Sequence, residues 1–310
     1  MKRNQTTPRL LHTSSSLLCI AIGMLAVMLA DVSKVAIADE NTSGVPVPQQ
    51  PNWQRQGDPA SFGRQIATYA DRFDAGWIDS YSQSKMTLFD AGGDKVTRDV
   101  RQQVLEGTRG DKSLVRFMTP ADIRGVAALT HEHPSATDDS WLYLPATRRV
   151  RRVSGANRTA SFQGTEFTYE DLSSLIVSRY EWRFLSEETI TVDGEQAQVY
   201  RLEARPTYEN TGYAKIIIDY HKEYFRVERM EYYDRAGQRL KTLVNSRWKR
   251  FHGRFWRAMQ LDMNNYQTGK RTLLESRAFF VNLSLYNRRD GTPRDNLNEQ
   301  QFTRRALENG

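Results

Sequence analysis

The segment His131-Glu132-His133 is where side chains of metal-binding type are grouped most densely in the sequence. On a β-strand, residues two positions apart project from the same face about 6.6 Å apart, so His131 and His133 could supply two metal ligands. The segment enters a polar loop at residues 134–138, where such a cluster needs no special role. We therefore expect no metal site and no cofactor.

Carboxylates that are adjacent in sequence, such as Glu187-Glu188 and Glu170-Asp171, are candidates for acid–base catalysis. Neighbours on a strand point to opposite faces of the sheet, however, so these pairs are typical of surface charges. The sequence also has no Gly-rich phosphate loop after a strand, no G-x-S-x-G motif and no H-E-x-x-H motif. We predict no catalytic residues and a protein that is not an enzyme.

Four arginines at positions 148, 149, 151 and 152 follow the apolar run at residues 141–144. On a strand, Arg149 and Arg151 point to one face. Guanidinium groups bind phosphates and carboxylates well, so one hypothesis is that Arg149 and Arg151 meet a lipid headgroup or an acidic partner. The alternative is a solvated cationic edge that discourages strand-to-strand aggregation. Either Glu170 or Asp171 is expected to pair with these arginines.

The N-terminus has the three parts of a secretory signal peptide. Basic residues precede an uncharged run at residues 17–30, and Ala36-Ile37-Ala38 follows as a cleavage motif. The apolar run is shorter than the roughly 20 residues that cross a bilayer, so a retained anchor is the lesser alternative. We predict that residues 1–38 are a cleaved signal peptide.

The composition excludes thiol chemistry and makes nucleic acid an improbable partner. The sequence has one cysteine, Cys19, which leaves with the signal peptide. The same cleavage removes four basic residues and one acidic residue, so the whole-chain charge of +7 falls to about +4. This near-balance, with the export signal, predicts no nucleic-acid binding, although basic patches can still contact an anionic membrane surface.

The residues after the signal peptide fall into three predicted parts. Residues 39–59 are rich in proline and predict a flexible linker. Residues 60–290 predict one compact domain, and residues 291–310 a polar C-terminal tail that docks weakly. Asp58 and Pro59 are typical of a helix start, and an amphipathic helix of about 18 residues is expected to follow. Its aromatic stripe consists of Phe62, Ile66, Tyr69, Phe73 and Trp77.

From Tyr81 onward, extended runs of alternating pattern are separated by short turns, such as Asp193-Gly194. About a dozen antiparallel strands in one domain predict a large, strongly curved sheet or barrel, within a mainly β fold of the α+β class. Several strands have one notably apolar face, including Phe255, Met259 and Leu261. These residues either fill the core or line a cavity on the concave side.

Three segments carry a family likeness: FMTPADIRGVAAL (117–129), DDSWLYLPATRRVRRV (138–153) and SFQGTEFTYEDL (161–172). In this order and spacing they resemble the outer membrane lipoprotein-sorting protein group, which is related to LolA-like periplasmic carriers of lipids and lipoproteins. The resemblance implies an incomplete antiparallel β-barrel with a helical lid over an apolar cavity, and a periplasmic location.

The implied function is a carrier or chaperone that binds the acyl chains of a lipid or lipoprotein and moves them between the envelope membranes. Members of the group look like partners of inner-membrane exporters of the resistance-nodulation-division (RND) type, with transient membrane-surface contact. The alternative is a lipid-sensing or accessory subunit of an export complex that carries no cargo. The residues expected to form the cavity and lid are Phe62, Ile66, Tyr69, Phe73, Trp77, Trp141, Tyr143, Phe255, Met259 and Leu261.

Overall fold

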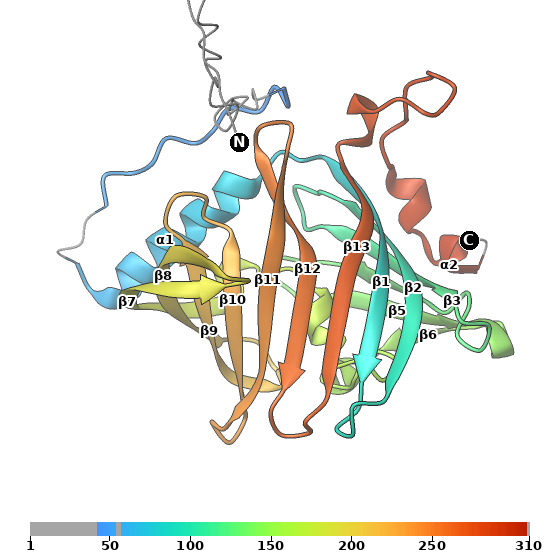
Figure 1. The fold of residues 1–310 in the computed structure, drawn as a ribbon, viewed down its shortest axis with the longest axis horizontal. Coiled ribbons are helices and arrows are strands. Elements are labelled where there is room, and N and C mark those ends of the chain that lie inside the picture. The colour runs from blue at the N-terminus through green and yellow to red at the C-terminus, as the bar shows by residue number, and fades with distance from the viewer. Residues whose placement is uncertain (1–41, 54–56, 309–310) are drawn as a thin grey trace, which may run out of the picture. The chain divides into compact units, whose positions relative to one another are not determined.

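The structure is a computed structural model that describes residues 42–53 and 57–308, so the expected signal peptide lies outside the described residues. The described chain forms one 13-stranded antiparallel sheet with two α-helices (Figure 1). The helices are α1 (Pro59–Asp74) and α2 (Arg304–Glu308). The strands are β1 (Asp79–Phe89), β2 (Lys95–Leu105), β3 (Lys112–Thr119), β4 (Ala127–His131), β5 (Asp139–Leu144), β6 (Arg149–Val153), β7 (Tyr180–Val192), β8 (Glu195–Pro206), β9 (Tyr213–His221), β10 (Val227–Asp234), β11 (Arg239–Phe251), β12 (Phe255–Asn265) and β13 (Arg271–Val281).

The first and last strands of the chain, β1 and β13, lie next to each other at the centre of the sheet. Strands β1 to β6 run from the centre to one edge, and β7 to β13 return from the other edge until β13 pairs with β1. The two edge strands, β6 and β7, are joined by residues 154–179, which we call the crossing segment. The expected large, curved antiparallel sheet is confirmed, and it is an open sheet rather than a closed barrel.

The short turns between strands are built from residues that favour them. In the turn between β1 and β2, the Asp90 carboxylate accepts hydrogen bonds from the backbone N–H groups of Gly92 and Asp94, both at 2.9 Å. Gly93 has a φ of 92°, a conformation that glycine adopts without strain. This local chemistry closes the hairpin and sets the register of two central strands.

Helix α1 begins as the sequence predicts but ends earlier. The Asp58 side chain caps it by accepting from the Ala60 N–H at 3.3 Å, and Pro59 occupies the first turn. The helix stops at Asp74, so Trp77 lies beyond it, contrary to the expected length. The Glu106 carboxylate on the loop after β2 accepts from the backbone N–H groups of Gly76 and Ile78, both at 2.7 Å. These bonds hold Gly76 and Ile78 in positive-φ conformations, which turn the chain away from the path of the helix.

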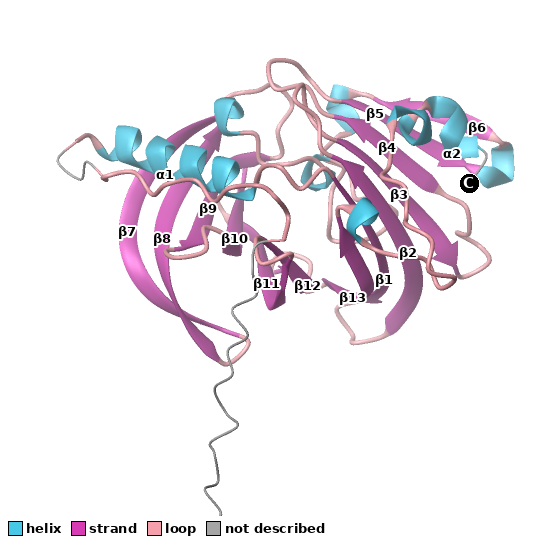
Figure 2. Ribbon diagram, turned by 90° about the horizontal axis from the view of Figure 1, so that it is seen from above, coloured by secondary structure: helices cyan, strands magenta, loops and turns pink. Residues whose placement is uncertain are grey.

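The arc of the sheet carries α1 at the end formed by β7 to β9 and α2 at the end formed by β4 to β6 (Figure 2). The buried side of α1 packs on β7 and β8, where Phe62 and Ile66 join Leu202 in the largest core cluster. Trp53, within the expected linker, packs edge-on against Tyr69 with the ring centroids 5.6 Å apart. Trp53 also contacts Tyr200 of β8, so it helps to hold the helix against the sheet.

The crossing segment is anchored to the concave face by buried charged groups. The Lys241 ammonium donates to the Asp171 carboxylate at 2.5 Å, and these side chains are only 2% and 3% exposed. Glu170 accepts from the Tyr208 hydroxyl at 2.7 Å and the Gly212 N–H at 2.8 Å. The expectation that Glu170 or Asp171 pairs with the arginines at 148–152 is therefore wrong, because Asp171 pairs with Lys241 on β11 and Glu170 is bonded to the loop between β8 and β9.

The C-terminal tail packs tightly, contrary to the weak docking expected from its polar sequence. Leu297, Phe302 and Leu307 are buried in one cluster with residues of β3 and β4. The Arg116 guanidinium donates to the backbone carbonyls of Ala306, at 3.0 Å, and Leu307, at 3.1 Å. A 3₁₀ turn at Glu299–Phe302 precedes α2, and this break brings the three apolar side chains into one cluster, which a single continuous helix would not do.

Candidate ligand-binding cavity

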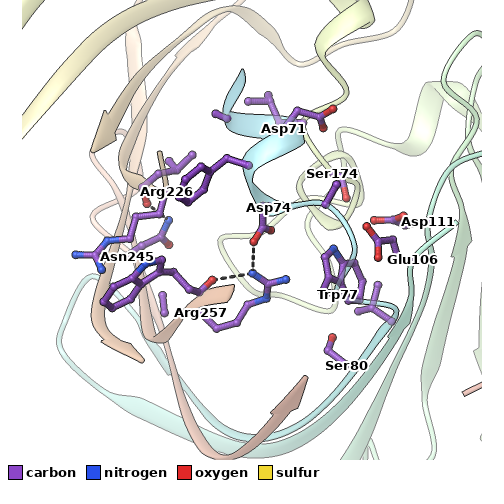
Figure 3. Close-up of a pocket in the computed structure, with 18 of the residues that line it drawn as sticks. Asp71, Asp74, Trp77, Ser80, Glu106, Asp111, Ser174, Arg226, Asn245 and Arg257 are labelled. Atoms are coloured by element: carbon purple, nitrogen blue, oxygen red, sulfur yellow. Dashed lines mark hydrogen bonds and ion pairs between the residues drawn. The ribbon is translucent and has the colours of Figure 1, made fainter. Parts of the chain in front are cut away.

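A cavity of about 1050 Å³ lies on the concave side of the sheet, beside the C-terminal half of α1 (Figure 3). Its walls come from β1, β2 and β10 to β13, together with the loop after α1 and part of the crossing segment. This volume is at the upper end of the roughly 300–1,000 Å³ that small-molecule sites occupy. The space is therefore large enough for a ligand rather than for a few water molecules.

The cavity exists because small side chains line its floor. On β1, Ser80, Ser82 and Ser84 point to the concave face, where most neighbouring strands place larger residues. Ser276 on β13 continues this floor, and its hydroxyl lies 3.3 Å from that of Ser84. The alternating S-x-S-x-S pattern at residues 80–84 is the sequence signal for this floor, and none of these serines was among the predicted cavity residues.

Aromatic and aliphatic side chains form the walls above this floor. Phe73 and Trp77 come from the helix and the loop after it, and Leu261 and Leu274 come from β12 and β13. Trp248 and Trp256 line the side formed by β11 and β12. A concave, largely aromatic surface of this kind suits the flexible apolar part of a ligand.

Carboxylates gather along one rim of the cavity, where Figure 3 shows Glu106 and Asp111 beside Ser174. Burial raises the pKa of Asp111 to about 6, against the hydrogen bond that its carboxylate accepts from the Gly107 N–H. Behind this rim, burial raises the pKa of Glu132 to about 7, and Glu132 accepts from the Ser174 N–H at 2.5 Å. This rim repels a negatively charged ligand group at neutral pH.

Arginines line a different part of the cavity, where Arg226 and Arg257 lie across from the acidic rim (Figure 3). Arg257 donates to the Asp74 carboxylate at 2.7 Å, and Arg226 donates to the Glu228 carboxylate at 2.8 Å. Arg254 lines the cavity as well. Burial lowers the pKa of Arg254, although an arginine remains charged in a protein. The cavity therefore has one acidic and one basic side.

The residues expected to form the cavity and lid occupy three separate places. Phe73, Trp77 and Leu261 line the cavity. The remaining seven lie in the packed clusters of the fold: Phe62, Ile66 and Tyr69 between α1 and the sheet, Trp141 and Tyr143 under the C-terminal tail, and Phe255 and Met259 beside Phe251 and Val281.

The strand β5 is half-buried, with packing on both of its faces. Leu142 and Leu144 pack toward Phe162 of the crossing segment, and Trp141 packs toward the C-terminal tail. Arg149 and Arg151 are exposed on β6, an edge strand, and neither lines the cavity. Their role in meeting a headgroup or partner stays a prediction.

The two histidines take part in structural contacts. The His131 Nε2 lies 2.6 Å from the Phe302 carbonyl oxygen in the docked tail, and the His133 Nε2 lies 3.1 Å from the Asp139 carboxylate. In the chain from residue 42 to 53 and from 57 to 308, three or more His, Cys, Asp or Glu side chains nowhere come together as metal ligands would. Within those same ranges, the helices are too short or too polar to cross a membrane.

Solved structures share this architecture. A domain of an outer membrane lipoprotein-sorting protein from Vibrio parahaemolyticus is 37% identical, with a TM-score of 0.72 over 80% of this chain and 99% of that one. A DUF1329 family protein from Desulfovibrio piger is 28% identical, with a TM-score of 0.71 over 81% and 100%. A LolA superfamily protein from Nitrosomonas europaea is 20% identical, with a TM-score of 0.59 over 79% and 98%, and shares the fold.

An open antiparallel half-barrel with a helix beside a concave cavity is thus a LolA-like fold. A family model described as "Uncharacterized protein" matches residues 109–309, which include much of the sheet and the tail. None of the curated proteins matched the chain. The 37% identity to the Vibrio protein, over 80% of this chain, shows that the chain belongs to the family of outer membrane lipoprotein-sorting proteins.

Proposed function

We propose that the protein is a periplasmic carrier or chaperone that binds the acyl chains of a lipid or lipoprotein in the cavity. The single observation that carries this proposal is the cavity of about 1050 Å³, with aromatic walls and a floor of serines. The sorting function in the name of the Vibrio relative supports the same proposal. The predicted signal peptide supports export to the periplasm.

Burial of an acyl chain supplies enough free energy for binding. Each buried CH₂ group contributes about 0.8 kcal/mol, so a fourteen-carbon chain gains roughly 11 kcal/mol before the entropy losses of binding. Because the same chain is equally well buried in a membrane, the carrier needs a donor or acceptor to load and unload. An inner-membrane exporter of the RND type, with brief contact between carrier and membrane, would fill that role.

The proposed role is binding without chemical conversion. The charged groups of the cavity that are described above are largely held in ion pairs and backbone hydrogen bonds, such as those of Arg257 with Asp74 and of Glu106 with the loop after α1. These contacts shape the rim of the cavity. They do not arrange a nucleophile beside a base.

Native mass spectrometry of the mature protein, purified from the periplasm without detergent and followed by organic extraction, tests the proposal. We expect a stoichiometric bound lipid, whose identity would name the class of cargo. A protein that stays ligand-free after incubation with mixed-lipid vesicles would contradict the carrier role. That outcome would favour the accessory subunit of an export complex, for which crosslinking in cells would identify the partner.

A further inference from the structure

Arg254 lies in the turn between β11 and β12 and is buried against the wall of the cavity. The whole residue is only 3% exposed. Its guanidinium carbon lies 4.8 Å from the centre of the Phe73 ring and 5.3 Å from that of Phe255. These ring contacts hold the cation in place, but they leave its hydrogen-bond donors unused.

None of the three guanidinium nitrogens of Arg254 has a hydrogen-bond partner among the residues that the structure describes. The nearby Asp74 carboxylate is paired with Arg257 at 2.7 Å. Burying a charge without a hydrogen-bond partner costs free energy, and this cost is offset only if some other group supplies the missing acceptors. Arg226, which also lines the cavity, already has such an acceptor in Glu228.

We propose that Arg254 is the headgroup site of the cavity and that it selects amphiphiles carrying one acidic oxyanion, a carboxylate or a phosphate, over neutral amphiphiles. This inference rests on the proposed function, because it assigns the polar end of the ligand whose chain the cavity holds. The three nitrogens are buried, so the side chain has to turn toward the open space of the cavity, where its planar guanidinium matches two oxygens of a carboxylate or phosphate.

The acidic rim limits the ligand to one acidic group. Glu106 and Asp111 line the cavity across from Arg226 and Arg257 (Figure 3), and Asp71 lines it from the helix. A second anionic group there would meet like charges, while the serine floor and the aromatic walls accept a chain. The ligand is thereby oriented, with its anion at Arg254 and its chain along β1 and β13.

Tryptophan fluorescence reports binding directly, because Trp77, Trp248 and Trp256 line the cavity. The mature protein is titrated at about pH 7.5 with dodecanoate, dodecyl phosphate and dodecanol, which share one chain and differ in charge. We expect the two anions to bind at least about tenfold more tightly than the alcohol, the effect of one charge-assisted hydrogen-bonded pair. Equal affinities for all three would overturn the inference but leave the proposed function standing, whereas binding of none would count against both.

The variant Arg254→Leu should lose the preference for anions and keep its affinity for dodecanol within about twofold. Its melting temperature without ligand should be unchanged or higher, because the substitution removes an unpaired buried charge. The matched control is Arg277→Leu, which removes an exposed arginine paired with Asp99 on the same sheet, and it should keep the preference. If Arg254 only supports the fold, Arg254→Leu would melt earlier and lose affinity for all three ligands alike.

Two further measurements complete the test. If Arg254→Leu does not fold, Arg254→Gln keeps a polar side chain of similar length without the charge and should likewise lose the preference. Inorganic phosphate alone distinguishes a lipid headgroup from a free anion. We expect inorganic phosphate to compete only weakly with dodecyl phosphate. If the two bound with equal affinity, the site would be one for a free anion and not for a lipid headgroup.

Discussion

At the scale of single residues, Glu132 gives the protein a pH-dependent stability. The residue is 6% exposed, and burial raises the pKa of its carboxyl group from 4.5 to about 7. The folded protein therefore holds a proton that the unfolded chain releases above about pH 4.5. This contribution to stability is complete below that pH and is lost as the pH rises through about 7.

We expect Glu132→Gln to raise the free energy of unfolding at pH 8, by on the order of 1–3 kcal/mol, and to have little effect at pH 4. Glutamine keeps an oxygen that can accept from the Ser174 N–H. Urea unfolding across this pH range checks the prediction, with the exposed Glu195→Gln as the control. A destabilisation of Glu132→Gln that is the same at every pH would contradict it.

The second prediction for single residues concerns the buried ion pair of Lys241 and Asp171. Lys241→Met leaves the Asp171 carboxylate without its cation, and the cost should be about 3–5 kcal/mol. The double variant with Asp171→Asn should be more stable than Lys241→Met alone, because no unpaired charge remains. Chemical denaturation of the two single variants and the double variant measures this coupling, and simple addition of the two costs would refute it.

At the scale of elements, the serine side of β1 determines how much space the cavity offers. Ser82→Leu places a larger side chain on the floor between Ser80 and Ser84. We expect lipid affinity to fall about tenfold or more with little loss of stability, because the new side chain enters open space. Gln83→Leu, on the exposed face of the same strand, is the matched control and should bind as the wild type does.

The C-terminal tail contributes buried side chains to the core, although its polar sequence predicted weak docking. Phe302→Ala removes a side chain that is 1% exposed, and the free energy of unfolding should fall by about 3–5 kcal/mol. The exposed Gln300→Ala in the same turn should change it by less than about 0.5 kcal/mol. Limited proteolysis should also cleave the Phe302→Ala variant sooner, within the segment after β13.

For the whole molecule, the sequence predicted the architecture well because alternation and turn residues act locally. The strands, their antiparallel pairing and the start of α1 all follow from such patterns. The end of α1 did not, because Glu106 fixes it from a distant loop. The docking of the tail depends on a 3₁₀ turn that the helical interpretation could not anticipate.

The cavity was harder to predict than the fold, for a physical reason. An apolar stripe shows which residues are buried, but core and cavity wall look alike in sequence. Phe62 and Phe73 share the stripe of α1, yet only Phe73 reaches the open space. The serines of the floor follow a pattern that the sequence does show, whereas the unpaired nitrogens of Arg254 are visible only when three-dimensional neighbours are known.

The seam between β1 and β13 has a consequence for the order in which the protein matures. Ser84 on β1 pairs with Ser276 on β13, so the first and last strands of the sheet meet near the middle of the cavity floor. During synthesis, β1 keeps an open pairing edge until the last strand has emerged, and such an edge is prone to pair with other chains. The cavity floor is thus completed last, and a partly made chain has no finished site in which to hold a lipid.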